Sequence, residues 1–173
     1  MRIVAGRWRG RQIDAPAGQQ VRPTLDRVRE AWMSILQRDI PGSRVLDLFA
    51  GSGALGLEAL SRGAVSVDFV EKDPGTIRVL KKNIETLDAA EMVKVHRAEV
   101  ATFLTGIEAG RYDIAFADPP YAGGAAAALA EVWLLTPFAR ILSVEHDARE
   151  TLPGAHETRR YGSSAITFYR SEE

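Results

Sequence analysis

The sequence predicts an α/β fold: a doubly wound, mostly parallel, seven-stranded sheet with an N-terminal β-hairpin arm and a C-terminal antiparallel hairpin. Three observations support this prediction. Apolar runs of strand length alternate five times with segments of helical spacing. A glycine-rich turn follows the first of those strands. The last two β-prone runs are joined only by Gly162-Ser163-Ser164, which is a tight-turn composition.

The first part of the chain predicts an arm followed by a connection. Residues 2–13 contain short β-prone pieces separated by glycine, which favours a hairpin. Residues 14–23 contain two prolines and a glycine and indicate a loop. We therefore expect a basic hairpin arm at residues 1–20 and the main domain at residues 21–173.

The main domain is predicted to begin with a helix and to continue as strand–helix units. Apolar residues recur at helical spacing after Thr24, which can cap the helix, and the pattern stops at Pro41. Strands are then expected at residues 44–50, 66–71, 92–98, 112–117 and 139–147. Helices are expected between them at residues 53–63, 74–88, 100–107 and 124–135. Trp32 and Trp133 lie on apolar helix faces, so we expect both in the core.

Composition excludes several kinds of site. The chain has no cysteine, which rules out disulfides, cysteine nucleophiles and thiolate metal ligands. No apolar run approaches the roughly 20 residues of a membrane span. The basic start has no apolar segment of the kind found in secretory signals. We therefore expect a cytoplasmic protein without a membrane partner.

Charge is unevenly distributed along the chain. The first 38 residues hold eight arginines, no lysine and three acids, a net charge of +5. The whole chain has a net charge of −1, so the remainder carries −6. A basic arm on an acidic body favours an anionic partner, and nucleic acid is the leading candidate. An uneven charge distribution between the ends of the chain is also common in small domains.

The first strand is followed by the glycine pattern G-x-G-x-x-G. Gly51, Gly53 and Gly56 supply it within VLDLFAGSGALG, and glycine allows a sharp turn and close approach to a ligand. Glu71 lies 20 residues after Gly51, at the end of the next strand, where a carboxylate can accept both ribose hydroxyls. Together these residues predict a site for a nucleoside-like ligand.

Asp47 favours a cationic nucleoside over a dinucleotide. It lies four residues before Gly51, and a negative charge directed at the loop suits a cation better than a pyrophosphate. S-adenosylmethionine has an adenosine, an amino group and a sulfonium, so it fits an acid-lined pocket. A nicotinamide oxidoreductase remains the alternative of another class, although the chain lacks a Tyr-x-x-x-Lys pair.

The fourth strand is followed by the sequence DPPY at residues 118–121. Pro119 and Pro120 have a fixed φ and no N–H, so a stiff loop can hold the Asp118 carboxylate and the Pro119 carbonyl as neighbouring acceptors. Two such acceptors match the two N–H donors of an exocyclic base amino group. Tyr121 offers a face on which a flipped-out base could stack. The DPPY sequence does not identify which base is bound, so the N6 amino group of adenine is an alternative target.

DLFAGSG, Glu71 and DPPY together resemble class I S-adenosylmethionine-dependent amino-methyltransferases, which have a Rossmann-like fold. More narrowly, AGRWRGR, RPTLDRVREAW and LDLFAGSGALGLEALSRGA are similar to the bacterial RsmD family of small-subunit ribosomal RNA guanine-N2 methyltransferases. The similarity runs from Arg2 to about Tyr121 and returns at YGSSAITFYR. It implies methyl transfer from S-adenosylmethionine to a guanine N2, with S-adenosylhomocysteine as product and no metal. The implied partner is an assembled or partly assembled small ribosomal subunit, and we expect a monomer.

The resemblance also implies a role for each matching residue. The implied catalytic residues are Asp118, Pro119 and Tyr121. The implied cofactor-binding residues follow the parts of S-adenosylmethionine. At the methionine part they are Arg22 and Thr24, which close over it, and Asp47, which lies near the methionine end. Gly51 and Gly53 pass beside the cofactor, Glu71 holds the ribose, Ala98 and Glu99 lie at the adenine, and Asp118 completes the set.

The arm is expected to contact RNA. Its cationic and aromatic side chains can neutralise phosphates and stack on a base. They are Arg2, Arg7, Trp8, Arg9 and Arg11. Two alternatives remain open: a solvated hairpin whose Trp8 packs on the domain, and a non-catalytic RNA-binding module, which would not need Asp118.

Overall fold

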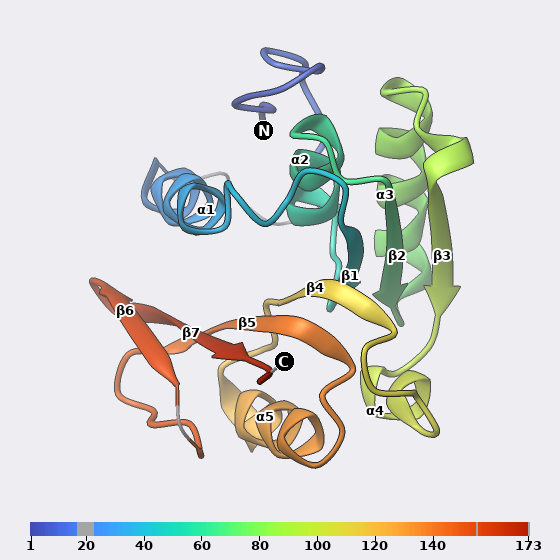
Figure 1. Ribbon diagram of the computed structural model, residues 1–173. Coiled ribbons are helices and arrows are strands. Elements are labelled where there is room, and N and C mark those ends of the chain that lie inside the picture. Colours follow the sequence, from blue (N-terminus) through green and yellow to red (C-terminus); the bar gives the residue numbers. More distant parts are fainter. Residues whose placement is uncertain (17–22, 155, 173) are drawn as a thin grey trace.

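The computed structural model describes residues 1–16, 23–154 and 156–172, except for the side chains of Pro23 and Thr24. Seven strands form one sheet in the order β3–β2–β1–β4–β5–β7–β6 (Figure 1). Strands β1 to β5 are parallel, while β7 runs antiparallel to both β5 and β6. The predicted fold class is therefore confirmed, including the antiparallel hairpin at the C-terminal end.

The elements follow the predicted order. The strands are β1 (Arg44–Leu48), β2 (Ser66–Glu71), β3 (Val93–Arg97), β4 (Tyr112–Ala117), β5 (Ala139–Asp147), β6 (Glu157–Tyr161) and β7 (Ser164–Arg170). The α-helices are α1 (Pro23–Ile35), α2 (Ala54–Ser61), α3 (Pro74–Thr86), α4 (Val100–Leu104) and α5 (Ala125–Leu135). Two 3₁₀ turns, η1 (Ala90–Met92) and η2 (Ala122–Gly124), precede β3 and α5. Within the described residues, no helix combines the length and the apolarity that crossing a membrane requires.

Helices cover both faces of the sheet. Helices α1, α2 and α3 pack on one face, and α4 and α5 pack on the other (Figure 1). As predicted, Trp32 lies in the first core and Trp133 in the second, with 1% and 5% of their surfaces exposed. Trp32 meets Phe116 of β4 edge-on at a centroid distance of 5.7 Å, which fixes α1 over the middle of the sheet.

Several elements end a few residues earlier than the sequence predicts, and β1 and α1 show why. Strand β1 stops at Leu48 because Phe49 has a φ of 57°, a left-handed conformation that cannot continue a strand. The turn at Phe49 directs the chain into the glycine loop. Helix α1 stops at Ile35, and hydrogen-bonded turns then carry the chain to Pro41.

The N-terminal residues form a short hairpin that packs on the domain. Arg2 and Gln12 form an antiparallel bridge, and the apolar residues Ile3, Trp8 and Ile13 belong to the core that also holds α1, α2 and α3. Trp8 is only 8% exposed. The expectation that its ring stacks on a base is therefore not supported, because the ring is enclosed by the domain; the packed alternative describes it correctly.

Helix α2 anchors the hairpin through polar contacts. The buried carboxylate of Glu58 accepts hydrogen bonds from the backbone N–H groups of Val4 at 3.0 Å and Ala5 at 3.2 Å. Ser61 donates to the carbonyl of Ala5 at 2.6 Å and accepts from the N–H of Trp8 at 3.0 Å. These bonds replace the sheet partners that so short a hairpin lacks, so α2 serves as its support.

Candidate active site

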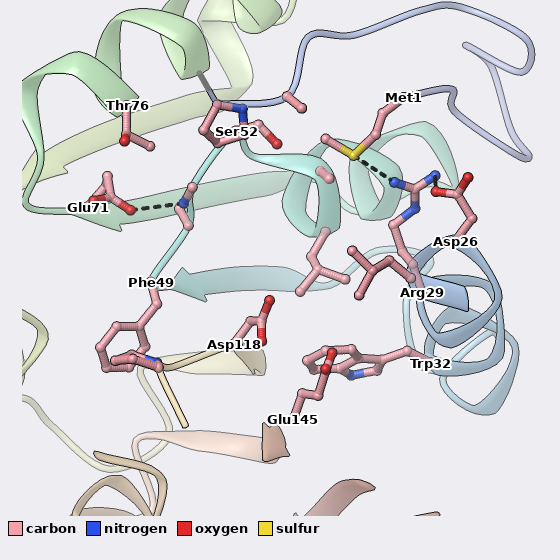
Figure 2. A pocket seen from close by; sticks show the side chains of 18 of the residues that line it. Met1, Asp26, Arg29, Trp32, Phe49, Ser52, Glu71, Thr76, Asp118 and Glu145 are labelled. Carbon is pink, nitrogen blue, oxygen red and sulfur yellow. Dashed lines mark hydrogen bonds and ion pairs between the residues drawn. The ribbon is translucent and has the colours of Figure 1, made fainter. Parts of the chain in front are cut away.

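A cavity of about 410 Å³ opens at the carboxyl ends of the central strands, beneath α1. This is where an open parallel sheet binds ligands, because the order of strands reverses between β1 and β4. Its polar lining comes from α1, β2, α3 and β5 and from the loops after β1 and β4 (Figure 2). The residues that matter below are Arg29, Trp32, Gly51, Glu71, Asp118 and Glu145.

Four carboxylates lie at the carboxyl ends of four neighbouring strands, on one face of the sheet. In the strand order β2, β1, β4 and β5 they are Glu71, Asp47, Asp118 and Glu145. Side chains alternate along a strand, so each acid shares its face with core residues two or four positions earlier. Those core residues are Phe69, Val45, Phe116 and Ile141. Three of these acids, Glu71, Asp118 and Glu145, line the cavity, and their carboxylates suit a ligand that carries positive charge.

The glycine loop is tied to Glu71. The N–H of Gly51 donates to Oε1 of Glu71 at 2.9 Å, and the N–H of Asp73 donates to Oε2 at 3.0 Å. Each carboxylate oxygen keeps a further lone pair for a ligand hydroxyl. Gly53 has a φ of 85°, and a Cβ there would lie 2.4 Å from Leu80. Among the described residues, apart from Gly51 and its two chain neighbours, no atom lies within 4 Å of the corresponding point at Gly51, so its backbone leaves room for a ligand.

Asp47 lies beneath the loop, and the structure does not bring it into the cavity. It is 1% exposed, and its Oδ2 accepts from the N–H of Gly56 at 2.9 Å. Gly53 at the start of α2 has no capping side chain, so Asp47 supplies the acceptor for the first turn from the neighbouring strand. Burial raises the pKa of Asp47 well above its usual range, although the Gly56 hydrogen bond opposes this shift. The geometry therefore indicates a capping role for Asp47, and its expected place near the methionine end of the cofactor stays a prediction.

Asp118 and Glu145 lie side by side in the cavity. The preceding residues, Ala117 and Val144, are paired in the sheet, so the two acids occupy the next position of the same register. The Asp118 side chain is accessible from the cavity, but the surrounding protein reduces its contact with bulk water. This desolvation raises the pKa of Asp118 to about 6. Burial, and then the charge of Asp118, raises the pKa of Glu145 to about 7. Both groups can therefore change protonation state near neutral pH.

Tyr121 joins this pair from the loop after β4. Its hydroxyl donates to Oε2 of Glu145 at 3.2 Å, and 45% of its surface is exposed. Burial, and then Glu145, raises the pKa of Tyr121 to about 12, so the hydroxyl stays a donor. Pro119 is buried and Pro120 lines the cavity. The stacking role of Tyr121 and the acceptor role of the Pro119 carbonyl stay predictions.

Two further residues expected near the adenine, Ala98 and Glu99, follow β3 directly. Ala98 donates through its N–H to the carbonyl of Glu71 at 3.2 Å, and Glu99 pairs with Lys72 at 3.7 Å. Lys72 lines the cavity, whereas Ala98 and Glu99 do not. Arg22 and the side chain of Thr24 lie outside the described residues, so their predicted roles are not addressed by the structure.

A family model described as "Conserved hypothetical protein 95" matches residues 1–170. The protein belongs to that family. Two curated relatives are named Ribosomal RNA small subunit methyltransferase D. The one from Escherichia coli K12 is 42% identical over 124 residues, which are 72% of this chain and 62% of that protein. The one from Haemophilus influenzae is 42% identical over 123 residues, which are 70% of this chain and 64% of that protein. The match thus spans less than two thirds of these relatives.

Solved structures match over almost the whole chain. An Escherichia coli protein described as "Putative methyltransferase yhhF" has a TM-score of 0.85 at 34% identity, covering 99% of this chain and 98% of that chain. A hypothetical protein from Thermus thermophilus has a TM-score of 0.83 at 34% identity, covering 99% of each chain. These findings confirm the Rossmann-like methyltransferase fold and the resemblance to the RsmD family.

The cavity of this family member contains residues that the motifs did not indicate. Glu145 lies in the strand segment SVEHD, and its only signal was an acid near a strand end, as for Glu71. Trp32 was expected only in the core, yet it also lines the cavity and donates to Ser143 at 2.8 Å. Arg29 is 8% exposed, and its Nε has no hydrogen-bond partner among the described residues.

The residues present fit S-adenosylmethionine, the methyl donor that membership of a methyltransferase family implies. Glu71 offers acceptors for a ribose, Gly51 leaves space beside the loop, and Asp118 adds negative charge to the cavity. A volume of about 410 Å³ lies within the range of small-molecule sites. Among the described residues, no cluster of three or more His, Asp or Glu side chains is arranged to hold a metal ion.

Proposed function

We propose that this protein transfers a methyl group from S-adenosylmethionine to the exocyclic N2 of a guanine in small-subunit ribosomal RNA. The observation that carries the proposal is a single cavity that joins the ribose-binding candidate Glu71 to the DPPY acid Asp118. The names of the curated relatives support ribosomal RNA of the small subunit as the substrate. The RsmD resemblance supports guanine N2 over adenine N6, which DPPY alone leaves open.

The chain's own residues prepare the amino group for attack. S-adenosylmethionine, when bound, supplies an electrophilic methyl group on a sulfonium. The Asp118 carboxylate and the Pro119 carbonyl accept the two amino hydrogens, which localises the nitrogen lone pair and fixes its direction. Positioning of this kind lowers barriers by several kcal/mol, up to roughly 7–11 in well-oriented systems. As the N–C bond forms and the S–C bond breaks, the amino proton passes to Asp118 or to water.

Cofactor binding is the first part of the proposal to test. Isothermal titration with S-adenosylhomocysteine should show one site per chain, and NADH should give no heat of binding. Glu71→Gln should weaken S-adenosylhomocysteine binding by about 10-fold, since a charge-assisted hydrogen bond contributes roughly 1.5–3 kcal/mol. Binding of NADH alone would instead support the oxidoreductase alternative.

The reaction itself is tested in cells. Nucleoside mass spectrometry of ribosomal RNA from cells with and without the protein should show the loss of one N2-methylguanosine from the small subunit. Re-expression of the protein should restore it. Loss of N6-methyladenosine with unchanged N2-methylguanosine would refute the guanine assignment and favour the adenine-N6 alternative.

The hairpin is proposed to bind RNA through its arginines. Arg2, Arg7, Arg9 and Arg11 are exposed, in contrast to Trp8. Arg7 also places its guanidinium 5.1 Å from the centre of the Trp8 ring, so the buried ring holds that cation at the surface. The binding contribution is therefore assigned to charge, without base stacking by Trp8.

Reversing two of these charges tests the hairpin. Arg7→Glu with Arg9→Glu should weaken binding to small subunits by about 10-fold or more at low salt and should flatten the dependence of affinity on salt concentration. Fluorescence anisotropy over a salt series measures both. The control, Arg78→Glu with Lys81→Glu on the exposed face of α3, changes net charge equally. Equal losses in the two double variants would mean that only net charge matters and would remove the hairpin from the interface.

A further inference from the structure

Glu145 has a free acceptor next to the acid that holds the amino group. The side chain is 9% exposed and lines the cavity, in the register position beside Asp118. The Tyr121 hydroxyl donates to its Oε2 at 3.2 Å. No hydrogen bond reaches its Oε1 from the residues that the structure describes. Figure 2 shows Asp118 and Glu145 both projecting into the cavity, with Trp32 beside Glu145.

Two neighbouring acceptors match the edge of guanine and conflict with that of adenine. Guanine presents its N2 amino group next to N1–H, so these two neighbouring positions are both donors. Adenine presents its N6 amino group next to N1, which carries a lone pair and no hydrogen. A carboxylate beside the amino-holding acceptor would therefore accept from guanine N1–H and repel adenine N1. Buried polar groups that lose their partner give strong discrimination of this kind.

We propose that Glu145 is the specificity-determining residue for guanine, accepting N1–H through its carboxylate while Asp118 holds the N2 amino group. This inference rests on the proposed function and deepens it. Tyr121 orients Glu145 by occupying Oε2, which leaves Oε1 for the base. Trp32 donates its own N–H to Ser143 rather than to Glu145, so it does not compete for that oxygen.

The elevated pKa of Glu145 is consistent with this role. Burial, and then the charge of Asp118, raises it to about 7, so the free protein holds a carboxyl group that is not fully ionised at neutral pH. An N–H donor at Oε1 stabilises the carboxylate form. Only the ionised carboxylate rejects a base with a lone pair at N1, because the protonated carboxyl group would donate to that lone pair. The preference for guanine should therefore increase as pH rises through about 7.

The test uses small subunits reconstituted with one altered nucleotide at the methylated position. 2,6-Diaminopurine keeps the N2 amino group, lacks the hydrogen on N1 and has an amino group in place of O6. The change in preference between wild-type protein and a Glu145 variant therefore reports the proposed contact at N1. Wild-type protein should prefer guanine by about 10- to 100-fold in kcat/KM, as expected for one hydrogen bond to a charged group. In Glu145→Gln the side-chain amide can rotate and donate to N1, so this preference should fall by about 10-fold or more.

Two further variants make the result decisive. Glu145→Asp keeps the carboxylate but shortens the side chain by one methylene, so the carboxylate no longer reaches the base. The rate of guanine methylation should fall, and the rate with 2,6-diaminopurine should not rise. Glu131→Gln, on the exposed face of α5, should leave both rates unchanged. S-adenosylhomocysteine affinity reports whether each variant is folded.

The outcomes separate this inference from the function on which it rests. An unchanged guanine preference in Glu145→Gln, with S-adenosylhomocysteine binding intact, overturns the role of Glu145 and leaves guanine-N2 methylation standing. Wild-type protein that transfers no methyl group to guanine N2 overturns both.

Discussion

Asp118→Asn is expected to lower kcat for methyl transfer by about 100-fold or more, as for other residues that take part in proton transfer, while S-adenosylhomocysteine affinity changes little. Asparagine has nearly the same shape, but its side chain can turn an NH₂ donor toward the amino group that Asp118 is proposed to accept. It also cannot take the proton that the attacking nitrogen releases. Single-turnover assays with radiolabelled S-adenosylmethionine, alongside isothermal titration, measure both quantities.

The pH dependence of wild-type activity provides a second readout. Burial raises the pKa of Asp118 to about 6, and the ionised form is the acceptor. The wild-type rate should therefore fall as pH decreases below about 6. Asp118→Asn should lack the part of this dependence that comes from Asp118 and keep only the part that comes from Glu145. Asp113→Asn makes the same change at the opposite end of β4, where Asp113 pairs with Arg44 at 3.2 Å, and should leave the rate unchanged. Near wild-type turnover by Asp118→Asn would show that Asp118 has no catalytic role.

Glu58→Ala is expected to lower the free energy of unfolding by about 3–5 kcal/mol, the cost of removing one partner from a buried ion pair. Glu58 is 1% exposed, accepts from Val4 and Ala5, and pairs with Arg62 at 3.0 Å. Its removal leaves two hairpin N–H groups and a mostly buried guanidinium without their acceptor. Urea unfolding at equilibrium, with linear extrapolation, gives the value.

A matched change on an exposed helix position serves as the comparison. Glu85→Ala in α3 should alter the free energy of unfolding by no more than about 0.5 kcal/mol, because Glu85 is exposed. Hydrogen exchange at Val4 and Ala5 should accelerate in Glu58→Ala and stay slow in Glu85→Ala. A loss under about 1 kcal/mol with both amides still protected would mean that the apolar contacts alone anchor the hairpin.

Local sequence patterns were sufficient to predict the fold and part of the cavity. Alternating strands and helices require a parallel sheet, and a parallel sheet brings the carboxyl ends of its strands to one edge. Glu71 and Asp118 were predicted on that basis, and both line the cavity. Their positions follow from strand ends alone, without knowledge of which side chains pack around them.

Residues whose roles depend on packing between distant segments were not predictable. Asp47 lies near the end of its strand as Glu71 does, but α2 begins directly above it and takes its oxygen as a cap. From the sequence alone, Glu58 is an ordinary charged residue on a helix, and only the packing of the hairpin shows that it is buried. Trp8 in a basic arm could face RNA or the core, and only the fit against α2 decides. The role proposed for Glu145 depends on the pairing of β5 with β4, which places Glu145 beside Asp118.

The way the hairpin is anchored has a consequence for biosynthesis. The hairpin is synthesised well before the residues that hold it: Glu58 follows Val4 by 54 positions, and Asn83 follows Asp14 by 69 positions. At roughly 5–20 residues per second, the growing chain carries unburied Ile3, Trp8 and Ile13 for several seconds. The segment with the most positive charge therefore waits for partners that follow it by more than 50 residues, and its arginines favour the solubility of that apolar segment until those partners are synthesised.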